Sequence, residues 1–341
     1  MSDDTAGRRP PSIRDVARLA DVSHQTVSRV LNSHPSIRPE TRDRVLEAMR
    51  TLNYHPNRAA RALVTSRSQT LGILAAGSTM YGPASSIASI EAAARSRGYW
   101  VNTANIDAAD PQSITNGLAH LMAQSIEGLV VIAPQVRVVR ALAAQRLDIP
   151  YVTLQSTDID PDHTLSVDQI AGARLATKHL ISLGHRYIYH LAGPQDWIEA
   201  EARMRGFLEE MGANDMPITP PILGDWSANF GYYAGRELLG VRDFTAIFAA
   251  NDQMALGLMH AVRDEGLDVP RDVSIVGFDD IPEAAHFWPP LTTVRQDFSE
   301  LGRRAVELLL GADAEADRSQ ATSTIAPELV VRASAGRAQL L

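Results

Sequence analysis

The sequence contains no cysteine, no long apolar run and no apolar segment at its start. The lack of cysteine excludes disulfides, thiol nucleophiles and cysteine-ligated metals, leaving only histidine and carboxylate chemistry. No stretch reaches the roughly 18 apolar residues that a membrane-spanning helix needs. The polar start MSDDTAGRRPPS lacks the apolar core of a signal peptide. We therefore expect a cytoplasmic protein that does not contact membranes.

The sequence also lacks the short motifs of common enzymes. It has no G-x-x-x-x-G-K-[ST], G-x-G-x-x-G, H-E-x-x-H or G-x-S-x-G. His185 and His190 flank the start of an expected strand and fit surface or packing roles better than metal ligation. Sugar hydrolysis needs two carboxylates at a set separation, and the adjacent Asp279 and Asp280 are expected to point in different directions. We therefore expect no enzyme activity, no catalytic residue, no metal and no cofactor.

Charge is distributed unevenly along the 341 residues, a length that suggests two or three folding units. The whole chain carries −8, yet residues 1–67 hold twelve arginines and seven acidic residues, a net charge of +5. A basic head on an acidic body suggests a DNA-binding end. A basic terminus without any function is the alternative.

Apolar residues from Ile13 onward recur at helical spacing in two short pieces separated by a tight turn. Asp21 lies in the turn and tolerates a left-handed backbone better than most residues. Ser23 suits the N-cap of the second helix. A third amphipathic segment starts at Pro39, which suits a first helical position. This pattern predicts a helix-turn-helix closed by a third helix.

The polar face of the second predicted helix has the chemistry of a major-groove reader. Glutamine pairs with adenine, arginine pairs with guanine, and histidine can donate or accept at a base edge. Threonine and serine suit phosphate contacts. The alternative is an ordinary polar surface on a small helical domain. The residues concerned are His24, Gln25, Thr26, Ser28 and Arg29.

Beyond residue 67, β-rich apolar runs alternate with helical stretches. This alternation predicts parallel sheets with helices on both faces, and the number of strands fits two similar lobes. Expected strands lie at 70–76, 99–105, 128–133, 150–155, 186–193, 245–251 and 272–280, with a crossover strand before 298 and a last strand within 324–332. Expected helices lie at 85–98, 114–124, 171–184 and 201–212.

Several of these segments closely resemble the LacI/GalR family of transcriptional regulators. They include DVARLADVSHQTVSRVLN, LNYHPNRAARAL, AANDQMALG, DVSIVGFDD and PPLTTVRQDF, and the resemblance covers nearly the whole chain. It implies an all-α helix-turn-helix head plus an α/β two-lobed periplasmic-binding-protein-like sensor. The implied limits are head 1–56, hinge helix and linker 57–67, sensor 68–332 and short tail 333–341. The N-lobe would comprise about 68–167 and 296–323, and the C-lobe about 168–295 and 324–332.

The resemblance also implies a hinge helix that orders on operator DNA and places Leu63 in the minor groove as an apolar wedge. Two positions depart from the family pattern: Asp21 replaces the usual turn glycine, and His24 replaces a tyrosine found in a relative. The second departure suggests a different operator sequence. The expected DNA-binding residues are Ile13, Ser23, His24, Gln25, Thr26, Ser28, Arg29, Asn32, Tyr54, Asn57, Arg58 and Leu63.

The family places its effector between the lobes, where strand ends and loops converge. Arginine, asparagine and aspartate can bridge sugar hydroxyls, while an aromatic face covers the C–H side of a pyranose. Alternative roles are strand-end turns for Asn251, Asp252, Asp279 and Asp280, core packing for Trp226, and a surface position for Arg203. The expected effector-binding residues are Met80, Gln155, Glu199, Arg203, Trp226, Asn251, Asp279, Gln296 and Phe298.

Some pocket positions depart from a relative, which carries Ser, Asp and Asn where this chain has Glu199, Gln155 and Ile132. Trp197 adds bulk nearby. We therefore expect a sugar with a changed hydroxyl pattern or an added ring.

These observations predict a transcriptional regulator, in the first place a repressor, whose operator affinity is controlled by a small sugar. The alternative is a purine- or nucleoside-responsive regulator that binds DNA when liganded, with Trp197, Trp226 and Tyr81 stacking on the base. The expected partners are a pseudo-palindromic operator and a second copy of the chain, since one recognition helix reads one half-site. A dimer is expected rather than a tetramer, because the sequence stops soon after the last strand.

Overall fold

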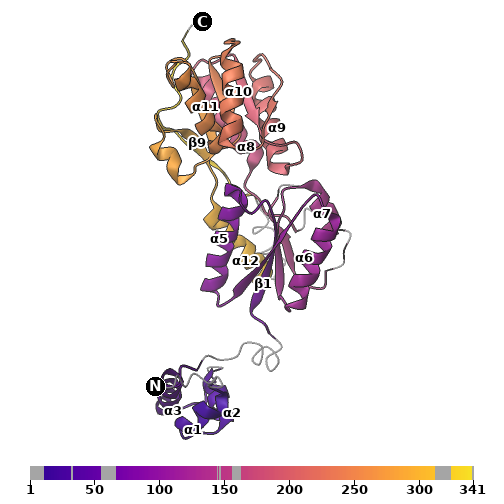
Figure 1. Ribbon diagram of the computed structural model, residues 1–341, viewed down its shortest axis with the longest axis vertical. Coiled ribbons are helices and arrows are strands. Elements are labelled where there is room, and N and C mark those ends of the chain that lie inside the picture. The colour runs from indigo at the N-terminus through magenta and orange to yellow at the C-terminus, as the bar shows by residue number, and fades with distance from the viewer. Residues whose placement is uncertain are drawn as a thin grey trace, which may run out of the picture. The chain divides into compact units, whose positions relative to one another are not determined.

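The computed structural model describes residues 11–31, 34–54, 67–143, 145, 147–155, 163–311 and 324–339. The chain divides into two compact units, residues 1–68 and 69–341, which we call the head and the sensor (Figure 1). Among the described helices, none is long and apolar enough to cross a membrane.

The head contains the three predicted helices, α1 (Ile13–Leu19), α2 (His24–Leu31) and α3 (Pro39–Thr51). The turn between α1 and α2 contains Asp21 at φ 50°, in the left-handed region. Ser23 caps α2, because its Oγ accepts a hydrogen bond from the Thr26 N–H at 3.1 Å. The predicted helix-turn-helix is therefore confirmed.

A small apolar core holds these helices together. One valine from each helix, Val16, Val27 and Val45, is fully buried. Full burial of a valine stabilises a fold by about 1.5–3 kcal/mol. Because α2 uses Val27 and Val30 for this core, its polar face is left for another partner.

The N-lobe of the sensor is a four-stranded parallel sheet in the order β2-β1-β3-β4. Figure 1 shows α12 beside α5 in this lobe, although α12 comes from near the end of the chain. The strands are β1 (Thr70–Ala76), β2 (Trp100–Ile106), β3 (Gly128–Ile132) and β4 (Tyr151–Thr153). The helices are α5 (Tyr81–Ser96), α6 (Pro111–Ala123), α7 (Val136–Ala143) and α12 (Phe298–Leu310).

The C-lobe is a six-stranded sheet in the order β10-β9-β8-β7-β5-β6, in which only β10 pairs in the antiparallel sense. The strands are β5 (Ile188–Ala192), β6 (Ile222–Leu223), β7 (Ala246–Ala249), β8 (Ser274–Asp279), β9 (Thr292–Arg295) and β10 (Glu328–Val330). The helices are α8 (Gln169–Ser182), α9 (Ile198–Ala213), α10 (Ala228–Leu239), α11 (Asp252–Asp264) and the 3₁₀ helix η2 (Pro282–His286).

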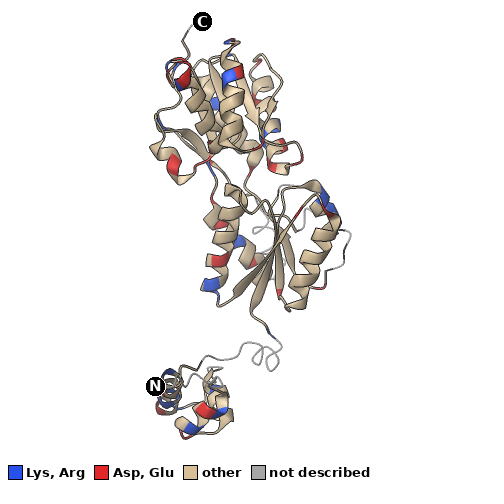
Figure 2. Ribbon diagram, viewed as in Figure 1, with Lys and Arg blue, Asp and Glu red and all other residues tan. Residues whose placement is uncertain are grey.

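Central strands of both sheets, such as β1, β3 and β7, carry no charged residue and are buried (Figure 2). Strands of this composition suit parallel sheets that are covered by helices on both faces. Their carboxyl ends place polar loops at one edge of each sheet, where ligands bind in folds of this class.

The chain passes between the lobes at segments that lie side by side. Asp168 N–H donates to Ile325 O at 2.9 Å, and Ile325 N–H donates to Ser166 O at 2.8 Å. A third passage joins β9 to α12. The expected limits of the lobes and of the hinge segment remain predictions.

The segment after 332, expected as a short tail, instead packs into the C-lobe. Ser334 is fully buried, and its Oγ donates to Ile275 O at 2.6 Å. Ala338 N–H donates to Leu183 O at 2.9 Å. The segment after 332 therefore forms hydrogen bonds with the backbone of the C-lobe. The sequence alone did not show these contacts.

Candidate functional site

The predicted recognition helix α2 presents polar residues opposite its buried face. His24, Gln25 and Arg29 are exposed, while Thr26 and Ser28 are half-buried. Ser23 is committed to capping, because its Oγ also lies 2.9 Å from Thr26 Oγ1. The exposed trio can therefore reach base edges, with Ser23 and Thr26 fixing the start of the helix.

Other expected DNA-binding residues lie outside α2. Ile13 and Tyr54 are half-buried and pack against the core of the head, so both have a structural role. Asn32, Asn57, Arg58 and Leu63 lie outside the described residues. The DNA-binding role of all these residues remains a prediction.

Within the sensor, a cavity of about 180 Å³ lies between residues of the two lobes. N-lobe residues such as Tyr81 and Ile132 and C-lobe residues such as Arg203 and Asp279 line it together. All nine residues expected to contact the effector line this one cavity: Met80, Gln155, Glu199, Arg203, Trp226, Asn251, Asp279, Gln296 and Phe298. Their binding of a ligand remains a prediction.

Four side chains in the cavity form a closed cycle of contacts. Arg203 Nε donates to Gln169 Oε1 at 2.8 Å, and Gln169 Nε2 donates to Gln296 Oε1 at 2.7 Å. Gln296 Nε2 donates to Asp279 Oδ1 at 2.7 Å, and Asp279 Oδ1 lies 3.3 Å from Arg203 Nη2. Arg203 is only 5% exposed, which excludes the surface alternative. The cycle holds a buried charge pair in a fixed orientation.

Asp279 has an unusual backbone and an altered acidity. Its φ of 109° lies in the left-handed region, where a non-glycine residue is strained. Burial raises the pKa of Asp279, while Arg203 and Gln296 act in the opposite direction. Backbone strain is frequent at ligand-binding positions, so this residue is the centre of the candidate site.

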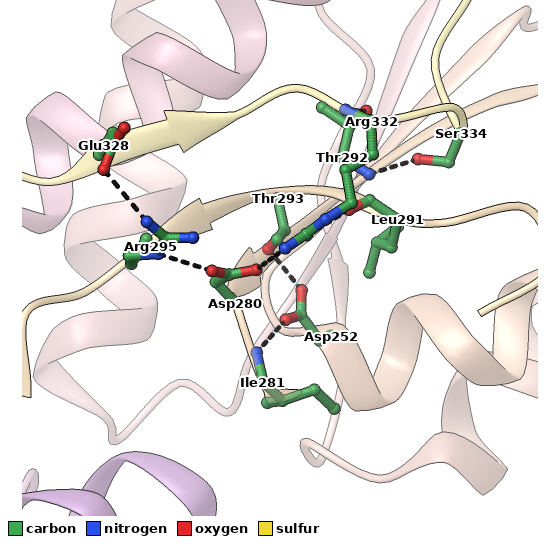
Figure 3. A network of polar contacts seen from close by, with 10 residues as sticks. All are labelled: Asp252, Asp280, Ile281, Leu291, Thr292, Thr293, Arg295, Glu328, Arg332 and Ser334. Atoms are coloured by element: carbon green, nitrogen blue, oxygen red, sulfur yellow. Dashed lines mark hydrogen bonds and ion pairs between the residues drawn. The ribbon is translucent and has the colours of Figure 1, made fainter. Parts of the chain in front are cut away.

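Asp280 points away from Asp279, as predicted. It lies 2.7 Å from Arg295 Nε and 2.6 Å from Arg332 Nη2 (Figure 3). In the same view, Asp252 accepts from the Ile281 N–H at 2.9 Å and from Thr293 Oγ1 at 2.5 Å. These contacts fix the end of β8 against β9 and α11, and they explain Asp252 and Asp280 as structural residues.

Asn251 and Trp226 combine structural contacts with access to the cavity. Asn251 Oδ1 caps α11 by accepting from the Met254 N–H at 2.9 Å, and its Nδ2 donates to Trp226 O at 3.0 Å. Trp226 also packs in the C-lobe core. Its ring lies so near Gly193 that a Cβ there would be 2.2 Å from Cη2. Trp226 therefore both packs in the C-lobe core and lines the cavity.

Aromatic pairs line the cavity from each lobe. Trp197 packs edge-on against Trp226 with ring centroids 5.6 Å apart, and Tyr81 packs edge-on against Phe298 at 5.9 Å. The Arg203 guanidinium lies 5.5 Å from the Trp226 ring centroid. These apolar walls beside polar groups suit a small polar ligand with apolar faces.

Sequence reasoning missed several lining residues, among them the two glutamines Gln169 and Gln253. Both lie in the first turn of a helix, next to Asp168 and Asp252. The position of Gln169 just after the chain enters the C-lobe was the available signal, but only the fold brings it to Arg203.

The structure shows where the two histidines singled out from the sequence lie. His185 is buried, contrary to a surface role, and contacts Thr245 Oγ1 and Gly336 O at 2.7 and 3.0 Å. His190 is buried between the rings of Phe207 and Phe248. In the described part of the chain, no group of three or more His, Asp or Glu residues could hold a metal ion.

Two family models match the chain. The model of the bacterial regulatory proteins of the lacI family matches residues 12–57, and that of a periplasmic binding protein-like domain matches residues 177–335. The lactose operon repressor of Escherichia coli is 35% identical over 305 residues, covering 89% of this chain and 84% of that protein. The HTH-type transcriptional repressor PurR of Mannheimia succiniciproducens is 33% identical over 331 residues, covering 95% and 98%.

Solved structures of transcriptional regulators are similar to this chain over most of its length. The lac repressor dimer bound to operator and the anti-inducer ONPF matches with a TM-score of 0.85 at 33% identity, covering 96% of this chain and 100% of that chain. A complex of the transcriptional regulator CelR with cellobiose matches with a TM-score of 0.68 at 30% identity, covering 95% and 99%.

Proposed function

Because the chain belongs to the lacI family of bacterial regulatory proteins, we propose that it represses transcription from an operator and releases that operator when a sugar binds between its lobes. It is a DNA-binding transcriptional regulator of this family. We propose that two copies bind a pseudo-palindromic operator in the cytoplasm.

The cavity supports a sugar as the effector. Its buried Arg203–Asp279 pair, held by Gln169 and Gln296, can bridge neighbouring hydroxyls. Trp226 supplies an apolar face for the C–H side of a sugar ring. Among the similar proteins, one relative is a lactose operon repressor and one solved structure contains cellobiose.

A thermal-shift screen of the full chain tests this proposal. The panel contains lactose, cellobiose, galactose and glucose, with hypoxanthine and guanine as the purine group. A ligand that binds only the native state raises the melting temperature by mass action. We expect at least one sugar to stabilise the protein and to release it from an operator selected from random DNA duplexes.

A purine effector is the second candidate. It is favoured by the 33% identity to the repressor PurR and by the Trp197–Trp226 pair, which could stack on a base. Stabilisation by a purine alone, together with tighter DNA binding, would replace the sugar proposal with this one.

We also propose that the chain does not hydrolyse its sugar. Asp279 faces Arg203 and Gln296, whereas Asp280 faces Arg295 and Arg332. The Asp279–Asp280 pair therefore cannot flank one glycosidic bond. Turnover of lactose or cellobiose by the purified protein would contradict this proposal.

A further inference from the structure

Several buried polar atoms of the cavity have no hydrogen-bond partner in the described part of the chain. Gln155, 1% exposed, lacks a partner at both Oε1 and Nε2. Trp226 Nε1, Glu199 Oε2 and Gln253 Oε1 are in the same condition. An unpaired buried polar atom costs roughly 1–3 kcal/mol. These atoms are positions at which a ligand in the cavity can form hydrogen bonds in addition to those with the Arg203–Asp279 pair.

Glu199 is the charged member of this set. It lies in the first turn of α9, four residues before Arg203. Arg203 already contacts Gln169, Ala250 O and Asp279, and no ion pair reaches Glu199 within the described residues. The charged or titratable groups that face it are Arg203 on its own helix and Asp279 from β8, with Tyr81 of α5 lining the same cavity. Burial raises the pKa of Glu199 to about 7.

The surroundings of Glu199 connect the two lobes. Ile198 N–H donates to Pro134 O at 2.8 Å, and Trp197 forms an antiparallel bridge with Gln135. The Trp197 ring comes so close to Gly77, at the end of β1, that a Cβ there would lie 3.1 Å from Cη2. Loops after β1, β3 and β5 therefore enclose this part of the cavity and give it an aromatic wall separate from the Tyr81–Phe298 pair.

We infer that Glu199, Gln155 and Trp197 form a second subsite for a hydroxyl-bearing second ring, and that Glu199 selects a disaccharide over a monosaccharide. The inference rests on the proposed function and names the class of its effector. Sugar hydroxyls can donate to Glu199 Oε2 and both donate to and accept from Gln155. A hydroxyl that donates to an ionised carboxylate makes a charge-assisted hydrogen bond. The Trp197 ring gives the second ring an apolar wall.

Proton linkage gives the subsite a measurable signature. Hydroxyl donors favour the ionised form of Glu199, so protonation competes with the second ring. A carboxyl group that titrates near 7 must be deprotonated for binding, which weakens disaccharide affinity about tenfold between pH 8 and pH 6. We expect a monosaccharide held by the Arg203–Asp279 pair to leave Glu199 uncontacted and to keep its affinity.

Calorimetric titration of the full chain tests the inference. Cellobiose and lactose are compared with glucose and galactose at pH 8 and pH 6, using the wild type, Glu199→Gln and Glu201→Gln. Glu201 is the matched control, since it lies exposed in the same turn of α9. We expect one disaccharide to bind more tightly than its monosaccharides, with about tenfold loss and no pH dependence in Glu199→Gln. The affinity of Glu199→Gln for monosaccharides should equal that of the wild type. Glu201→Gln should have wild-type affinity for all four sugars.

Two outcomes would overturn the inference, and they are distinguishable. Monosaccharides that bind as tightly as disaccharides, or a Glu199→Gln variant with wild-type affinity and pH profile, would refute the second subsite while leaving a sugar effector intact. Failure of every sugar to bind the wild type would refute the proposed function and the inference with it. A wild-type urea unfolding transition of Glu199→Gln shows that the variant's sensor is folded.

Discussion

His190 shows how one buried residue can set the acid stability of the sensor. Its ring is fully buried between Phe207 and Phe248, 4.9 and 4.7 Å from their centroids. Its Nδ1 lies 2.9 Å from Phe248 O. Burial lowers the pKa of His190 from 6.5 to about 4, with the backbone contact opposing this and Arg203 contributing to it. The ring is therefore neutral in the folded protein at neutral pH.

The sign of the pH effect follows from this shift. Between pH 6.5 and pH 4 the unfolded chain binds a proton that the native state does not, so stability falls as the pH falls. Between pH 7 and pH 5 this single group should cost about 2 kcal/mol. Urea unfolding of wild type and His190→Gln at both pH values measures the difference. His286→Gln, at an exposed position, is the control, and equal pH slopes for wild type and His190→Gln would contradict the prediction.

Residues of the cavity show both the reach and the limit of sequence reasoning. Motifs placed Asn251 and Asp279 at strand ends, and the fold has Asn251 as the N-cap that follows β7 and Asp279 as the last residue of β8. Arg203, expected in the cavity by resemblance, lies in the second turn of α9. The contact between Arg203 and Gln169 could not be foreseen, because it joins two helices whose sequence patterns are independent. The enclosure of Glu199 Oε2 likewise depends on loops from both lobes.

At the scale of elements, local signals predicted the head well. Ser23 as N-cap, Asp21 in the left-handed turn and Pro39 at the start of α3 are local features that need no tertiary contact to act. The expected helices did not include α7, α10, α11 or α12. Helix α11 is amphipathic, with an exposed stripe that includes Leu256 and His260, so a helical pattern was present in the sequence and was not used. Strand β6 has two residues, too few to show alternation.

Helix α2 should control which base pairs the protein prefers. Replacing Gln25 or Arg29 by alanine removes an exposed side chain that can pair with a base edge. Each change should cost roughly 1–3 kcal/mol, at its own operator position only. Fluorescence anisotropy titrations against a library of operator variants measure this loss of discrimination.

Two further variants give the contrast. Arg58→Ala, outside the described residues, should weaken binding to all sequences alike, as expected of a phosphate contact. Arg50→Ala removes an exposed arginine of α3 that pairs with Glu47 and should leave base preference unchanged. If Arg29→Ala kept full discrimination between operator and scrambled DNA, α2 would not be the recognition helix.

At the scale of the whole molecule, we predict a dimer in solution. One copy of α2 reads one half-site, and a two-fold axis supplies the second half-site of a pseudo-palindrome. The lac repressor that matches this chain was solved as a dimer on operator. Light scattering at micromolar concentration should give twice the 37.0 kDa mass of one chain. A monomer or a tetramer under those conditions would contradict the prediction.

Communication between the cavity and the head should depend on Asp279. The first strand of the sensor, β1, follows directly after the head in the chain. The carboxyl end of β1 leads to Gly77, which lies beside Trp197. A ligand that draws the lobes together therefore acts on the strand to which the head is joined. The hinge segment 57–64, outside the described residues, is too short to be a stable helix by itself. We propose that it is the bistable element and that sugar binding disfavours its DNA-bound form. A ligand shifts such an equilibrium only through its different affinity for the two states, on the order of 1–3 kcal/mol per coupled site.

Replacing Asp279 by asparagine separates the two functions of the chain. The variant keeps the side-chain volume and an acceptor for Gln296 but removes the charge opposite Arg203. We expect Asp279→Asn to bind operator with wild-type affinity and to lose release by the sugar found in the thermal-shift screen. Asp280→Asn is the control: it weakens ion pairs with Arg295 and Arg332, so it should lower the free energy of unfolding by about 2 kcal/mol yet keep the sugar response. Operator titrations with and without sugar distinguish the variants. Loss of operator binding in a folded Asp279→Asn protein would mean that the cavity also maintains the DNA-binding state of the head, and that sensing and DNA binding are not separable at this residue.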